Sequence, residues 1–185
     1  MNVARLAARA IIGGLFVGHG TQKLQGWFGG PGLQGTEGMM QALDMHPPRR
    51  NAIAAGVTET AGGALLATGL ATPLATAGLI GTMITAIRKV HLPNGPWAAN
   101  GGYEYNLVMI AALLALTEDG PGTLSLDAAR GSERSGLLWA LGALALGAAA
   151  STAAIELGSR SAPTTDTDGD PSAYPETAGD PVTSG

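Results

Sequence analysis

The sequence predicts an all-α, membrane-embedded protein: a four-helix bundle, a fifth transmembrane helix after it, and a disordered tail. Three observations support this prediction. Charged residues make up only 13% of the chain, about half of their share in soluble domains. The apolar residues gather in five long runs. One run, residues 136–155, contains no charge and is long enough to cross a hydrocarbon core of about 30 Å.

The other four runs are interrupted by ionisable or polar side chains. They are residues 3–23, 52–70, 73–87 and 103–117. Most of the basic residues lie near the ends of runs, where long side chains reach the membrane interface: Arg5, Arg9, Lys23, Arg88 and Lys89. Glu59 lies well inside its run, so interfacial placement does not explain it. The third run is apolar apart from threonines, whose hydroxyls can bond back to their own helix.

The first run is predicted to be a retained helix. Ala10–Gly18 has the length of a signal-peptide core, and Arg5 and Arg9 resemble a basic leader. However, GHGTQKLQGW follows instead of a small-residue cleavage site. We therefore expect an uncleaved membrane anchor.

The connections between runs differ in length. In Leu24–Asn51, the segment GWFGGPGLQG opposes a stable helix, and a short surface helix is expected at Thr36–Leu43. Trp27 and Phe28 suit the membrane interface. A tight turn joins runs two and three, with Pro73 at a helix start. The next connection, residues 91–102, is again rich in Gly and Pro.

Three regions follow from this pattern: the bundle at 1–128, a linker with the fifth helix at 129–158, and an acidic tail at 159–185. From residue 160 onward, five acidic residues stand against Arg160 alone. The tail also lacks large apolar residues, so we expect it to be disordered and solvated. It is expected to aid solubility, with binding of a partner as the alternative.

Several function classes find no support in the sequence. The absence of cysteine excludes disulfides, thiol redox chemistry, iron–sulfur clusters and thiolate metal sites. A redox role would therefore need an organic cofactor, haem or a partner subunit. Neither a Glu-x-x-His pattern nor a dense ligand cluster predicts a metal site. Phosphate-binding loops and nucleophilic triads are missing, and no nucleic-acid partner is expected.

Six ionisable residues fall toward the same side of the membrane if the runs are helices of alternating direction. They are His19, Lys23, Glu59, Arg88, His91 and Glu104. Each such group costs about 2.5–3.5 kcal/mol inside a bilayer on insertion scales, so each is a functional candidate. Tyr103, beside Glu104, adds a phenol. The sequence predicts a polar site inside the bundle, with these seven residues as ligand-binding candidates and no assigned catalytic residue.

Each candidate also has a structural interpretation. Arg88 can lie at the interface, and His91 can simply begin a loop. Glu59 is either a proton-carrying or ligand-binding carboxylate, or one half of an internal salt bridge to Lys23 or Arg88. Elsewhere, Gly14 and Gly18 form a GxxxG pair, which allows close approach of another helix and most simply serves packing.

Six segments together resemble the DoxX family of bacterial membrane proteins. They are HGTQKL at 19–24, GWFGGPG at 26–32, TETAGGALLATGLATPLA at 58–75, the His91 loop, GGYEYN at 101–106 and DGPGTLSLD at 119–127. The resemblance covers about residues 5–128. It implies a core four-helix membrane bundle and a multi-pass protein of the bacterial cytoplasmic membrane. The fifth helix and the tail extend beyond that core.

The resemblance also implies functional alternatives. The family takes its name from a subunit of a terminal quinol oxidase or thiosulfate:quinone oxidoreductase, and actinobacterial relatives resemble a scaffold for detoxifying enzymes. Its pattern marks His19, Gly20, Lys23, Glu59, Gly102, Tyr103 and Glu104 here. It assigns none of them a chemical role.

Three functions are therefore expected for the bundle. The first is a quinone-linked oxidoreductase subunit, because the candidate side chains supply hydrogen-bond donors for quinone carbonyls and carboxylates for its protons. The second is a non-enzymatic scaffold or accessory subunit, in which polar residues join helices. The third is small-molecule transport, although no inverted repeat is evident. Quinone suits the residues better than haem, since facing histidines are not predicted. Expected partners are the bilayer and either other oxidoreductase subunits or further copies of the chain.

Overall fold

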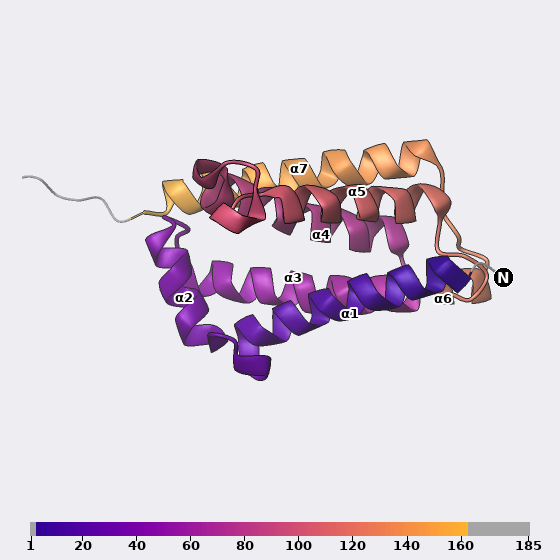
Figure 1. The fold of residues 1–185 in the computed structure, drawn as a ribbon, viewed down its shortest axis with the longest axis horizontal. Coiled ribbons are helices and arrows are strands. Elements are labelled where there is room, and N and C mark those ends of the chain that lie inside the picture. Colours follow the sequence, from indigo (N-terminus) through magenta and orange to yellow (C-terminus); the bar gives the residue numbers. More distant parts are fainter. Residues whose placement is uncertain (1–2, 163–185) are drawn as a thin grey trace, which may run out of the picture.

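The computed structural model describes residues 3–162, and within this range every regular element is helical (Figure 1). The α-helices are α1 Val3–Gln25, α2 Gly32–Ala42, α3 Pro48–Thr68, α4 Thr72–Ala86, α5 Glu104–Asp119, α6 Leu126–Ala129 and α7 Leu137–Arg160. Short 3₁₀ turns occupy Trp27–Gly29, Leu92–Asn94 and Ala98–Asn100, and α4 continues into a π-helical turn at Ile87–His91. Helices thus form over all five predicted runs.

The long helices make two layers. Figure 1 shows α1 beside α3, with α4, α5 and α7 in the other layer and α2 across one end. A tight turn joins the layers between α3 and α4, with Gly69 and Ala71 both at positive φ. Buried side chains from both layers form one core, to which α1 and α3 contribute Phe16 and Leu66. The layer of α4, α5 and α7 contributes Leu79, Ile80, Met83, Met109 and Leu113.

Glycines allow α1 and α3 to pack backbone against backbone. A Cβ atom at Gly63 would lie 2.5 Å from the carbonyl oxygen of Gly13. A Cβ at Gly20 would lie 2.6 Å from that of Gly56. In contrast, a Cβ at Gly14 or Gly18 would meet no atom within 4 Å among the described residues. The predicted GxxxG pair therefore does not join these helices, because it faces outward and Gly13 and Gly20 make the contact instead.

The membrane prediction is supported most directly by α7. Of the helices in the described range, α7 alone is both long enough and apolar enough to cross a bilayer by length and composition. Charged residues lower the hydropathy of α1 and α3, while α4 and α5 have only 15 and 16 residues. The acidic tail predicted at 159–185 lies almost wholly outside the described residues.

The first connection contains more helix than predicted. We expected GWFGGPGLQG to remain irregular, but α2 begins at Gly32. Packing explains the difference, because Thr36 is fully buried and its hydroxyl donates to the carbonyl oxygens of Lys23 and Gly32, at 3.1 and 2.8 Å. Contacts with α1 thus outweigh the low helix propensity of the glycines.

Candidate functional site

The six ionisable candidates do lie toward one end of the bundle, where α1 ends and α3 begins. We call this the α2 end, and the opposite end the α6 end (Figure 1). At the α2 end, only one pair of the candidates is in direct contact: Lys23 Nζ donates to Glu59 Oε2 over 2.6 Å. The Glu59 side chain is only 7% exposed and that of Lys23 22%, so the ion pair is largely removed from solvent. This matches the internal salt-bridge interpretation of Glu59.

The other candidates bind separate parts of the chain. Arg88 donates to the Thr152 hydroxyl on α7 over 3.0 Å, away from Glu59. His91 Nδ1 lies 2.7 Å from the carbonyl oxygen of Gly101, so Nδ1 donates there. Glu104 accepts from the backbone amide of Ala98 over 2.9 Å. The candidate set therefore does not converge on one point.

The two remaining candidates have local roles. His19 Nδ1 pairs with the side-chain oxygen of Gln22, 3.1 Å away on the exposed face of α1. Tyr103 precedes α5, and its backbone amide donates to the Gly95 carbonyl over 3.2 Å. The negative charge of Glu59 also acts on the phenol of Tyr105, a residue absent from the candidate set. The α2 end thus contains the Lys23–Glu59 ion pair, with Tyr105 within range of its electrostatic field.

The α6 end holds a second polar cluster, which the sequence did not predict. Arg9 was expected to reach the membrane interface, but it is only 1% exposed, so that expectation is wrong. Its guanidinium donates to the carbonyl oxygen of Leu124 over 2.7 Å and to that of Pro121. These two carbonyls belong to the short segment between α5 and α6, and Arg9 supplies a hydrogen-bond donor to each of them. The segment belongs to the motif DGPGTLSLD, which was the only sequence signal for this contact.

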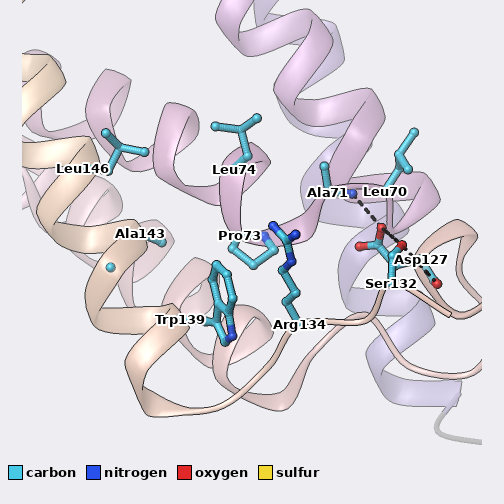
Figure 2. Close-up of a pocket in the computed structure, with 11 residues that line it drawn as sticks. Leu70, Ala71, Pro73, Leu74, Asp127, Ser132, Arg134, Trp139, Ala143 and Leu146 are labelled. Atoms are coloured by element: carbon cyan, nitrogen blue, oxygen red, sulfur yellow. Dashed lines mark hydrogen bonds between the residues drawn. The ribbon is translucent and has the colours of Figure 1, made fainter. Parts of the chain in front are cut away.

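Asp127 in α6 binds the start of α4. Its carboxylate accepts from the backbone amide of Ala71 over 2.9 Å (Figure 2). It also accepts from the backbone amide and the hydroxyl of Thr72, each over 3.2 Å. An anion at a helix N-terminus also meets the positive end of the helix dipole. Burial alone would raise the pKa of Asp127, but the hydrogen bonds from Ala71, Thr72 and Ser132 together hold it below its usual value.

A hollow of about 540 Å³ opens beside Asp127, between the start of α4 and the start of α7 (Figure 2). Its walls are mostly apolar, from Pro73, Leu74, Trp139 and Leu146. The guanidinium of Arg134 lies at its edge, 5.0 Å from the ring centre of Trp139, in a cation–π contact. The hollow therefore combines an apolar wall with one exposed cation.

Comparison with known proteins decides the family. The DoxX family model matches residues 4–92. Residues 4–92 belong to the DoxX family. The chain is thus a membrane protein of that family, as the sequence motifs predicted. No curated protein and no solved structure matches it.

The DoxX match runs from α1 to the turn that follows α4. It includes the Lys23–Glu59 ion pair, Arg9 and the α1–α3 glycine contact. It does not include Asp127 or the loop that Arg9 binds, so Arg9 joins the matched part of this DoxX protein to the part that follows.

Replacing Asp127 with asparagine should make the free energy of unfolding depend less on pH under acidic conditions. Because the folded pKa is lowered, the ionised carboxylate stabilises the fold above its ordinary pKa of about 4, and that gain is lost as pH falls through the folded pKa. The variant should lose about 1 kcal/mol near neutral pH, as for loss of a helix cap. Unfolding in detergent between pH 7 and pH 3 measures both effects.

Asp119→Asn is the matched control, because Asp119 lies at the same end and is 64% exposed. Its ion pair with Arg5 is long, at 4.0 Å, and therefore weak. The stability curve of this variant should keep the wild-type slope. Equal slopes for wild type and Asp127→Asn would contradict the assigned role of Asp127.

Proposed function

We propose that this DoxX protein is a multi-pass protein of the bacterial cytoplasmic membrane that acts as a non-catalytic scaffold or accessory subunit of an oxidoreductase complex. One observation supports the scaffold role above the others. The ionisable candidates for ligand binding are bonded within the chain, and they contact separate partners. Polar groups arranged in this way hold helices and loops in place.

The multi-pass arrangement is supported by the outward surface of the helices. Large apolar side chains on several long helices are exposed, which suits contact with lipid tails better than with water. They include Ile11, Leu15, Leu107, Val108, Leu138, Leu141 and Leu157. Threonine hydroxyls within α4 donate to carbonyl oxygens of their own helix, as at Thr76, Thr82 and Thr85. These hydroxyls therefore need no hydrogen bond to water. We infer that all five long helices cross.

The second candidate is a quinone-linked subunit, and the observation in its favour is the Lys23–Glu59 pair with Tyr105 in its electrostatic field. Lys23 and Tyr105 carry donors for a quinone carbonyl, and Glu59 can exchange a proton. However, Lys23 and Glu59 already neutralise one another at 2.6 Å. A quinone would therefore have to compete with a charge-assisted hydrogen bond, which is why we place this function second.

Native mass spectrometry separates the two functions. The full chain is extracted in mild detergent from the membrane in which it is made naturally, as wild type and as Glu59→Gln. The scaffold role predicts an oxidoreductase subunit bound in fixed stoichiometry, with no quinone mass on the chain. A quinone adduct on the wild type that Glu59→Gln loses would replace the scaffold proposal with the quinone-linked one.

Glu59→Gln should also lower the free energy of unfolding by about 2 kcal/mol. Breaking a fully buried ion pair costs about 3–5 kcal/mol, and the partial exposure of Lys23 reduces that cost. The matched control is Glu37→Gln, because Glu37 pairs with Arg49 over a longer 3.4 Å and Arg49 is 65% exposed. That change should cost about 1 kcal/mol or less. Equal losses for both variants would argue against a structural role for the Lys23–Glu59 pair.

A further inference from the structure

The hollow between α4 and α7 changes in polarity along its length. Ser132 and Arg134, in the segment that leads into α7, lie at its polar end. Leu74 and Leu146 lie further along the two helices and make it apolar there (Figure 2). The hollow therefore has the polarity of an amphiphile, with a cation at one end and hydrocarbon at the other.

The position of the hollow in the bilayer follows from α7. This helix begins at Leu137 and is apolar enough to cross the membrane, so the residues just before it lie at the membrane surface. Trp139, near its start, has the amphipathic side chain that favours the interface. Leu146 is two helical turns deeper, or about 10 Å at 1.5 Å per residue. The apolar end thus reaches the depth of lipid acyl chains.

The charges around the hollow favour an anion. Asp127 also lines it, but its carboxylate accepts hydrogen bonds from the start of α4 and from Ser132. Among the described residues Arg134 pairs with no carboxylate, and its guanidinium lies over the Trp139 ring, 5.0 Å from the ring centre. A guanidinium binds phosphate oxygens well because its donors match their spacing.

We propose that this hollow is a groove that binds one anionic phospholipid from the adjoining leaflet. The phosphate lies against Arg134, and one acyl chain lies between Leu74 and Leu146. The walls of the groove continue into the exposed apolar face of α7, so the lipid enters sideways from the bilayer. This inference rests on the membrane placement of α7 and is independent of the scaffold role.

Lipid retention by the full chain tests the proposal. Protein in mild detergent is mixed with phosphatidylglycerol or with phosphatidylcholine of the same chains, and bound lipid is counted by native mass spectrometry. Arg134→Gln removes the cation, with Arg130→Gln as its control, because Arg130 is exposed at the same end but does not line the groove. Gly142→Leu fills the groove, since a Cβ at Gly142 meets no described atom within 4 Å. Its control, Ala149→Leu, places a leucine on an exposed part of α7 outside the groove.

The wild type should retain one phosphatidylglycerol, with affinity about tenfold above that for phosphatidylcholine. Arg134→Gln should remove this preference, and Gly142→Leu should weaken both lipids about tenfold, while the two control variants bind like wild type. Arg134 is exposed, so its replacement leaves the fold intact and its result stands even if Gly142→Leu does not fold.

Three results would overturn the proposal. Equal retention by wild type, Arg134→Gln and Gly142→Leu would show that the lipid lies elsewhere. Equal loss in Arg134→Gln and Arg130→Gln would indicate general charge attraction instead of a groove. Displacement of the lipid by free glycerol phosphate at equal concentration would identify a soluble anion, and not a lipid, as the ligand.

Discussion

Replacing Arg9 with alanine is expected to lower the free energy of unfolding by about 3 kcal/mol, the largest effect of any single side-chain truncation that we predict. The guanidinium donates to two backbone carbonyls, at Pro121 and Leu124, and each hydrogen bond to a charged group contributes about 1.5 kcal/mol or more. Its removal also leaves those carbonyls without their partner in a buried place. Thermal or denaturant unfolding in detergent, followed by circular dichroism, measures the loss.

Two further variants make this result specific. Arg9→Lys retains the charge but not the forked donors, so it should recover less than half of the lost stability. Arg130→Ala removes an exposed arginine at the same end and should change stability by about 0.5 kcal/mol or less. If Arg9→Ala unfolded like the wild type, the buried guanidinium would have no structural role.

Replacing Gly63 with alanine should destabilise the protein by about 1–3 kcal/mol, although alanine favours helices more than glycine does. The added Cβ would lie 2.5 Å from the Gly13 carbonyl oxygen and 2.8 Å from the Val17 backbone nitrogen, so α1 and α3 must separate. Separation would also weaken the nearby Lys23–Glu59 ion pair. The same unfolding assay measures the cost.

Gly14→Ala gives the opposite expectation. No described atom lies within 4 Å of its new Cβ, so only the gain in helix propensity remains, up to about 1 kcal/mol. The signs of the two changes should therefore differ. Destabilisation of the same size at both positions would mean that Gly14 also lies in a close contact, for instance between two copies of the chain.

The sequence predicted the helices well because long apolar runs leave few alternatives. All five runs became helices, and the tight turn before Pro73 lies within two residues of its expected place. The sequence also placed Lys23 and Glu59 on the same end, and the direct bond between them was one of two pairings left open. These properties depend on spacing along one helix and on alternation of direction, both of which can be read from the chain.

What the sequence could not predict depends on the rotation of each helix about its axis. Arg88 was the alternative salt-bridge partner predicted for Glu59, but its guanidinium donates to Thr152 on α7 instead. Gly14 and Gly18 show the familiar GxxxG spacing, yet the face of α1 that meets α3 holds Gly13 and Gly20. Rotation is set by the packing of the whole core, so no local pattern reveals it.

Arg9 was misplaced for a related reason. A basic residue near a helix end normally reaches the interface, since burial of a charge without partners is costly. The partners here are backbone carbonyls more than a hundred residues away in the chain. Carbonyls are present in every residue, so the sequence gives no signal that those at 121 and 124 are free to accept.

The contact between α4 and α7 has a consequence for synthesis of the chain. A Cβ at Gly147 would lie 2.7 Å from the Ala77 carbonyl oxygen, so these two backbones touch, and α4 also packs on α5. The α1–α3 pair has both members early in the chain and can assemble while translation continues. By contrast, α4 emerges long before α7. In the proposed multi-pass arrangement, α4 must keep its small-residue face against lipid until the ribosome has delivered α7.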